Sequence, residues 1–393
     1  MAYLVFLHAC FLAALAANAN VYATNLRVNH STNNAAISSA NSVEISYILN
    51  EAASGGVTFQ ILSDTNVIQT FEFLAGTPGA VRGTNSVLWN GTDDDGDPVA
   101  EGLYSVSITA RATGFQIWTQ TTDDTNVGNF VFEPRGIAVN QNTNSPFYGR
   151  VFVGNAHASG AASDKPGANV GILKLNADGS GADEGVFSTG GYSWAGDFYS
   201  PWKIEVSADD KVYINDWNAL TEGIIIAFDQ EISPNRQIIL DDDNWPNGGF
   251  ADLSGPYVTG SGTNTQLWTA DVSTNFGGSV GIVGFNVDTN GAVADDDTGF
   301  TAVAATNSDL DMAPYDVALD RSGNIYTIQR VTDLDNPQNR VLRFPAFDGT
   351  NILTNADWKV GTNDDTLINA YGIAVDPTGT YVAVAVRGYG SSG

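Results

Sequence analysis

The sequence has a single cysteine, and its position limits what that residue can do. Cys10 lies in an N-terminal apolar segment, residues 4–17. If this segment is removed on export, the mature chain has no disulfide, no thiol nucleophile and no cysteine-ligated zinc. Histidine is nearly as scarce, because His8 lies in the same segment and leaves only His30 and His157. One histidine in the C-terminal two thirds cannot build a multi-histidine metal site.

Positively charged residues are also few. The chain has 16 Lys and Arg against 44 Asp and Glu, for a formal net charge of −28. Such a chain repels nucleic acid and anionic lipid head groups, which disfavours both as partners, and we expect no nucleic-acid partner. The excess acid sits in short Asp clusters. These clusters fit either a solvated acidic surface or cation binding.

The helix formers Lys, Glu and Gln are few, whereas Thr, Val, Ile and aromatic residues are plentiful. With 42 glycines, this composition predicts an all-β protein of short strands joined by turns. A chain of 393 residues is long enough for two or three domains.

The apolar segment predicts an export signal over residues 1–23. It is too short to span a bilayer comfortably, and small residues follow at the spacing that signal peptidase requires, ending at Ala19 or Ala23. No Lys or Arg precedes the apolar run, so either the true start lies upstream or the signal is atypical. No second segment has the character of a membrane span. We therefore expect a protein that is secreted, or extracellular at the cell surface.

Residues 24–112 predict a β-sandwich. In Tyr104–Ala110, apolar residues alternate with Ser and Thr, which is the period of a strand with one face on a core. Several such strands within about 90 residues are typical of a sandwich. The expected strands are Ser42–Leu49, Gly56–Leu62, Gln69–Leu74, Ser86–Trp89 and Gly102–Ala110.

The end of this region resembles the Ig-like domain of flagellar hook capping proteins. The pattern is Trp-Asx-Gly, an Asp-rich turn closing in Gly-x-Pro-Val, then Gly-x-Tyr opening the last strand. The resemblance implies an Ig-like fold and a spacer or docking role, with no enzymatic activity. The matching residues are Trp89, Asn90, Gly91, Asp93, Gly96, Pro98, Val99, Gly102 and Tyr104.

The Asp-rich turn allows two interpretations. Asx side chains cap their own backbone and Gly supplies positive φ, which makes a plain turn. Carboxylates at Asp93, Asp95 and Asp97 could also hold Ca²⁺ through oxygen, although the spacing departs from an EF-hand loop. Calcium is therefore the one cofactor that the sequence allows.

Residues 130–393 contain a repeat of 55 to 67 residues. Each unit opens with a similar segment and continues through a turn into further strands, giving four short strands per unit, as in a propeller. The openings are Pro134–Val139, Pro201–Val206, Pro256–Thr259, Pro314–Leu319 and Ala370–Val375. The fourth strands are expected at Gly185–Ser188, Arg236–Leu240, Thr301–Ala304 and Asp357–Val360.

These openings and hairpins resemble NHL-type repeats and related six-bladed propellers, with their Pro-x-Gly-Ile-Ala-Val-Asp and Gly-Asn-Ile-Tyr patterns. The resemblance implies a β-propeller but no particular function, because the superfamily holds scaffolds, lyases, lactonases and phosphatases. Four full units are followed by a fifth that stops after two strands, at Val382–Val386. We expect either that the chain continues past Gly393 or that a five-bladed ring lacks a strand. Residues 113–129 are a linker or a closing strand, to which Gly114–Thr121 would contribute.

Five residues at one position of the repeat are the candidate binding residues. They follow the opening Pro or Ala, near the mouth of the central channel, and four are aromatic: Arg135, Trp202, Tyr257, Tyr315 and Tyr371. Such rings stack on a sugar or another flat ligand, or they wedge adjacent blades together.

A second aromatic patch precedes Trp202. The segment Gly190–Trp202 contains Trp194 and Tyr199 and makes the first repeat the longest. It is either an inserted loop on the binding face or a hydrophobic plug over the channel.

No residues form a recognisable catalytic set. His157 is best interpreted as a surface loop residue, because nearness to Ser159 and Asp164 in one loop does not establish a triad. The leading hypothesis is a secreted or cell-surface binding protein with a protein or glycan ligand. The propeller would be the recognition face and the Ig-like domain a spacer. The alternative is a Ca²⁺-dependent extracellular hydrolase or lyase, kept open by Asp241–Asp243 and Asp295–Asp297.

Overall fold

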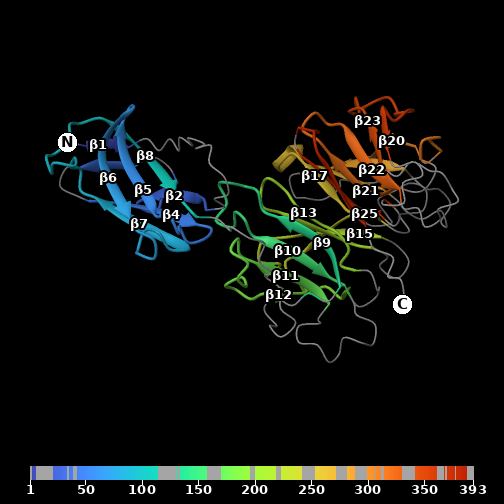
Figure 1. Ribbon diagram of the computed structural model, residues 1–393, viewed down its shortest axis with the longest axis horizontal. Helices are drawn as coiled ribbons and strands as arrows, with labels where there is room; N and C mark the ends of the chain where they lie inside the picture. The colour runs from blue at the N-terminus through green and yellow to red at the C-terminus, as the bar shows by residue number, and fades with distance from the viewer. Residues whose placement is uncertain are drawn as a thin grey trace. The chain divides into compact units, whose positions relative to one another are not determined.

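A computed structural model shows an all-β chain, as the composition predicts (Figure 1). No α-helix occurs in the residues that it describes, and a short 3₁₀ helix, η3 (Gly262–Asn264), precedes one strand. The structure describes residues 2–5, 21–32, 35–38, 42–113, 131, 133–156, 170–194, 200–217, 223–240, 253–270, 281–287, 299–304, 306–310, 314–329, 341–360, 367, 370–376 and 378–386.

The chain forms two compact units. The first contains residues 1–121 with two short segments, 140–151 and 175–182. The second contains residues 122–139, 152–174 and 183–393. The predicted sandwich, 24–112, lies within the first unit, and most of the repeat lies within the second.

The first unit has a five-stranded sheet, in the order β3-β1-β8-β5-β6, and a three-stranded sheet, β2-β4-β7. Pairing is antiparallel except between β1 and β8, which run parallel. The strands are β1 (Ala2–Val5), β2 (Ala23–Val28), β3 (Ala35–Ser38), β4 (Val43–Leu49), β5 (Val57–Ser63), β6 (Asn66–Phe73), β7 (Gly83–Trp89) and β8 (Leu103–Ala110).

One core joins these two sheets. Along β4 every second residue is buried, from Val43 to Leu49, so one face of the strand packs inward. The Tyr47 ring lies 6.0 Å from the Phe59 ring of β5, and its hydroxyl donates to the Gly79 carbonyl (2.7 Å). Residues of both sheets belong to the same buried cluster, so the unit is a two-layer sandwich. Its identity as an Ig-like domain remains an interpretation.

The second unit consists of four four-stranded sheets, whose strands are neighbours in chain order, and one two-stranded hairpin. The first sheet contains β9 (Pro134–Val139), β10 (Val151–Asn155), β11 (Gly171–Leu175) and β12 (Phe187–Ser188). The second contains β13 (Ile204–Val206), β14 (Val212–Asp216), β15 (Ile224–Phe228) and β16 (Gln237–Leu240). The third contains β17 (Tyr257–Thr259), β18 (Gln266–Ala270), β19 (Ile282–Asn286) and β20 (Gly299–Val303). The fourth contains β21 (Pro314–Leu319), β22 (Ile325–Gln329), β23 (Val341–Phe344) and β24 (Trp358–Val360), and the fifth β25 (Ala370–Val375) and β26 (Val382–Val386).

Successive sheets pack face to face. Every residue of β14 and of β15 is buried, because neighbouring sheets cover both faces of these middle strands. Four buried clusters lie between consecutive sheets, from the first and second to the fourth and fifth. The first strands of successive sheets are neighbours: β9 and β13, β13 and β17, β17 and β21, β21 and β25. This is the packing expected of propeller blades, although the described residues do not form a closed ring. The proposed closing strand, Gly114–Thr121, lies outside them.

Candidate functional site

Four aromatic rings meet where the first strands of the second, fourth and fifth sheets begin. We call Trp202, Trp217, Tyr315 and Tyr371 the aromatic cluster. The Trp202 ring centre lies 6.2 Å from that of Tyr315 and 6.0 Å from that of Tyr371, and the two tyrosines are 5.4 Å apart, edge to face. Trp217 adds contacts of 4.6 Å to Trp202 and 5.3 Å to Tyr315. Such tilted pairs gain stability beyond the area that they bury.

Burial divides the aromatic cluster into two kinds of ring. Trp202 and Trp217 are 2% and 7% exposed, so they pack between sheets. Tyr315 and Tyr371 are half-buried and keep part of their surface accessible. The burial of Trp202 and Trp217 fits the wedge interpretation, whereas Tyr315 and Tyr371 keep surface that a ligand can reach.

Two cations lie over the buried indole. The guanidinium carbon of Arg135 is 5.6 Å from the Trp202 ring centre, and Lys203 Nζ is 5.7 Å from it. A cation over an aromatic face is attracted by the negative face of the ring. Arg135 also forms an ion pair with Glu133 (3.1 Å), so positive charge at this point is largely balanced.

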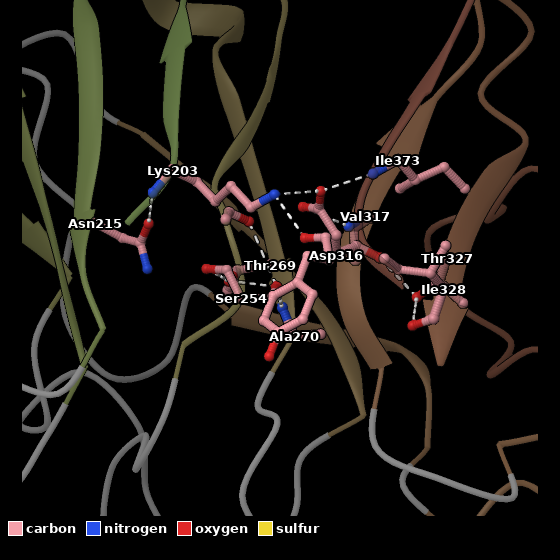
Figure 2. Close-up of polar contacts among 12 residues, drawn as sticks. Lys203, Asn215, Ser254, Thr269, Ala270, Asp316, Val317, Thr327, Ile328 and Ile373 are labelled. Atoms are coloured by element: carbon pink, nitrogen blue, oxygen red, sulfur yellow. Dashed lines mark hydrogen bonds and ion pairs between the residues drawn. The ribbon is translucent and has the colours of Figure 1, made fainter. Parts of the chain in front are cut away.

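An ion pair crosses from the second sheet to the fourth, as Figure 2 shows. Lys203 Nζ lies 3.1 Å from Asp316 Oδ2 and donates to the backbone carbonyl of Tyr371 (2.7 Å). The Ile373 N–H donates to Asp316 Oδ2 (2.9 Å), and the Val317 N–H donates to Asp316 Oδ1 (3.1 Å). We call Lys203 and Asp316 the central brace, because they tie β13, β21 and β25 together.

The central brace occupies the third position of the repeat opening. In the first and fifth sheets that position is glycine, Gly136 and Gly372. A Cβ added at Gly136 would lie 2.7 Å from the Lys203 Cα, and one at Gly372 would lie 2.9 Å from Lys203 Nζ. Glycine in two repeats thus leaves room for a charged side chain in two others. Lys203 and Asp316 were not identified as a pair from the sequence. Their opposite charges, at a repeat position that is glycine in two other units, could have indicated the contact.

A carboxyl beside the central brace has an unusual proton affinity. Burial, followed by the negative charge of Asp316, raises the pKa of Glu205 to about 8. A hydrogen bond from Val206 and the positive charge of Lys203 oppose the shift. At neutral pH Glu205 is therefore mostly protonated and able to donate a hydrogen bond.

A cavity of about 390 Å³ adjoins the aromatic cluster. It is within the size range of small-molecule sites. Its wall combines a half-buried ring, two cations, a carboxylate and aliphatic groups. The lining includes Glu133, Arg135, Trp202, Lys203, Tyr371 and Val386.

The structure thus brings together Arg135, Trp202, Tyr315 and Tyr371 of the predicted binding residues, and places two others elsewhere. Tyr257 lies between the third and fourth sheets, where its hydroxyl donates to the Leu319 carbonyl (2.5 Å). Trp194 is buried in the core between the first and second sheets, with its ring centre 4.6 Å from that of Tyr192. Tyr199 lies outside the described residues.

The Asp-rich turn of the first unit uses one carboxylate to hold its own backbone. Asp93 Oδ1 accepts from the N–H groups of Asp95 (3.1 Å) and Asp97 (2.9 Å), while Asp94 Oδ1 accepts from Thr70 N–H (2.9 Å). Across the described ranges, no three His, Cys, Asp or Glu side chains gather in a way that could hold a metal ion. His157, Asp241–Asp243 and Asp295–Asp297 lie outside those ranges.

No protein-family model matches the chain, and no curated protein matches its sequence. Within the part of the chain that the structure describes, no helix has the length and apolarity needed to cross a bilayer.

Proposed function

We propose that this chain is a secreted or cell-surface binding protein. Its second unit recognises a glycan beside the aromatic cluster, and its first unit acts as a spacer. The observation that carries the proposal is the convergence of Arg135, Lys203 and Tyr371 on one cavity of about 390 Å³. These residues come from three different sheets, so the packing of the second unit assembles the wall.

The chemistry of the wall suits a polar ligand of low charge. Arg135 is paired with Glu133, and Lys203 with Asp316, so donors and acceptors are present with little net charge. The half-buried Tyr371 supplies an apolar ring face beside them. Sugars present this combination, an apolar ring face edged by hydroxyl groups, and the pockets that bind them pair aromatic rings with fixed polar groups.

A glycan array probed with the full chain, followed by calorimetry on any hit, tests this proposal. Tyr371→Ala should weaken glycan binding about tenfold, because it removes the accessible ring. Tyr381→Ala is the matched control, since that tyrosine is 75% exposed and does not line the cavity. The proposal would be overturned if no glycan binds, or if both variants reduce glycan binding equally. If the chain binds a protein and no glycan, the ligand is a protein and the glycan proposal is wrong.

A Ca²⁺-dependent hydrolase or lyase is the second candidate function. The supporting observation is that a mostly protonated Glu205 lies near the charged Asp316, and carboxyls of different protonation can serve as acid and base. Turnover of esters, lactones or glycans in the presence of calcium, abolished by Glu205→Gln, would favour this candidate. Binding without turnover would leave the first proposal in place.

A further inference from the structure

A second cavity of about 580 Å³ lies at the turn that follows β21, between the third and fourth sheets. We propose that it binds a small molecule with a carboxylate on a flat or apolar body. The proposal does not depend on the glycan site, because the two cavities share no lining residue. The argument uses five lining residues: Tyr257, Trp268, Asp320, Arg321 and Phe347.

The apolar wall of this cavity is fixed in place by the surrounding structure. The Trp268 ring meets Phe300 edge to face at 5.2 Å, and Phe300 stacks on Phe347 at 5.1 Å with an interplanar angle of 10°. Tyr257 is held by its hydrogen bond to the Leu319 carbonyl. Aromatic walls that are already ordered lose little conformational entropy when a flat ligand enters.

Arg321 supplies the charge for an anionic ligand. It is exposed on the turn, and no acidic side chain in the described ranges forms an ion pair with its guanidinium. In a chain with 44 acidic residues, a cation without such a neighbour attracts a carboxylate from solution.

The neighbouring carboxylate of Asp320 is occupied by its own turn. Its oxygens accept from the N–H groups of Ser322 (2.8 Å) and Asn324 (3.0 Å), and from the Asn324 side-chain amide (2.8 Å). The Tyr326 hydroxyl donates to it as well (3.3 Å). Burial raises the pKa of Asp320, but these donors together outweigh it, so the pKa is lowered. The donors also compensate its charge, which reduces its repulsion of an anion beside Arg321.

Trp268 lines the cavity, but its indole nitrogen is sealed from solvent. The residue is 5% exposed, and its indole N–H meets no acceptor among the residues that the structure describes. A buried donor without an acceptor costs free energy, but a ligand in the cavity does not reach this one. The proposal rests on the aromatic wall and on Arg321.

Two classes of molecule share the required chemistry: aromatic carboxylic acids and uronic acids. Calorimetry on the full chain with phenylacetate and with glucuronate distinguishes them, and phenylacetamide and glucose are the uncharged counterparts. We expect one acid to bind and its uncharged counterpart to bind about tenfold more weakly, the usual effect of losing a charge-assisted hydrogen bond.

Two variants connect binding to this cavity. Arg321→Gln should weaken binding of the acid about tenfold, whereas Lys211→Gln, which removes a positive charge that does not line the cavity, should not. Ala346→Phe should block binding by filling the cavity from an exposed position in its wall, with the melting temperature retained. Tyr371→Ala should leave this binding unchanged, which separates it from the glycan site. No binding of either acid, or binding unaffected by Arg321→Gln and Ala346→Phe, would overturn the proposal.

Discussion

Lys203 and Asp316 form an ion pair of 3.1 Å between two sheets although 113 positions separate them in the chain. Their side chains are only 15% and 10% exposed, so the pair lies in a region of low dielectric. Because Lys203 also donates to the Tyr371 carbonyl, the brace sets the distance between the second, fourth and fifth sheets. The rings and cations of the proposed glycan site come from the same strand ends, so their geometry depends on this pair.

Removing one partner of the central brace is expected to cost more stability than removing both. Lys203→Met leaves Asp316 as a largely buried charge without its cation, and should lower the free energy of unfolding by about 3–5 kcal/mol. The double variant Lys203→Met with Asp316→Leu removes both charges and should recover much of that loss. Urea unfolding of the two single variants and the double variant measures the coupling.

The Arg343–Asp357 ion pair provides the control for these variants of the central brace. It is short, 2.8 Å, but its side chains are 34% and 43% exposed. Solvent screens such a pair, so Asp357→Asn should cost about 1 kcal/mol or less. If breaking either ion pair lowered the free energy of unfolding equally, the central brace would have no special role in stability.

Two glycines next to Lys203 should respond differently to alanine. The Cβ of Gly136→Ala would meet backbone atoms, Lys203 Cα and the Trp202 carbonyl, both at 2.7 Å, so the strand would have to move. The Cβ of Gly372→Ala would first meet Lys203 Nζ at 2.9 Å, the end of a flexible side chain. We expect a clearly larger fall in melting temperature for Gly136→Ala. A fall of the same size in both variants would show that the backbone contact is not the limiting one.

The raised pKa of Glu205 predicts a loss of stability with rising pH. Its carboxyl ordinarily titrates near 4.5 but titrates at about 8 in the folded chain. Between these values the folded chain keeps a proton that the unfolded chain releases. The stability from this proton is therefore fully present below pH 4.5 and is lost as pH rises through about 8.

Glu205→Gln should flatten the pH profile in that window. The variant cannot ionise, so above the folded pKa it should be more stable than the natural chain. Urea unfolding across the interval provides the measurement. Asp309 and Asp320 do not interfere, because their pKa values are lowered from an ordinary 3.8 and change below the window. If the free energy of unfolding of Glu205→Gln falls with pH as steeply as that of the natural chain, other groups cause the pH dependence.

The backbone of the Asp-rich turn should depend on Asp93 more than on Asp95. Asp93→Ala removes the acceptor of two backbone N–H groups and should cost about 1 kcal/mol of unfolding free energy. Asp95→Ala, at an exposed position whose N–H donates in the turn, should change stability by less than about 0.5 kcal/mol. Thermal unfolding with calcium and with a chelator distinguishes the two interpretations of the turn. A calcium-dependent rise in melting temperature that Asp95→Ala removes would support the cation site.

Local strand structure could be predicted well from the sequence. The openings expected at Pro134–Val139, Pro314–Leu319 and Ala370–Val375 have the same bounds as β9, β21 and β25. Alternating apolar residues and glycine-containing turns determine such strands within a few residues, without help from the rest of the chain. The all-β class followed from the same local preferences and is confirmed.

The membership of the site could be predicted only in part. Tyr257 occupies the same repeat position as Tyr315, yet it packs between the third and fourth sheets. Trp217 belongs to the aromatic cluster but follows β14 and not a repeat opening. Contacts between sheets depend on how their faces pack, and a single repeat unit contains no information about the residues that approach it from elsewhere in the chain.

The separation of the two brace residues also sets an order of events during synthesis. Lys203 is made 113 residues before Asp316 and 168 residues before Tyr371, whose carbonyl it also binds. At about 5–20 residues per second, the second sheet waits roughly 6–23 s for its charged partner in the fourth. The middle of the second unit is therefore completed only when the fourth and fifth sheets have been made, and Lys203 stays without its carboxylate until then.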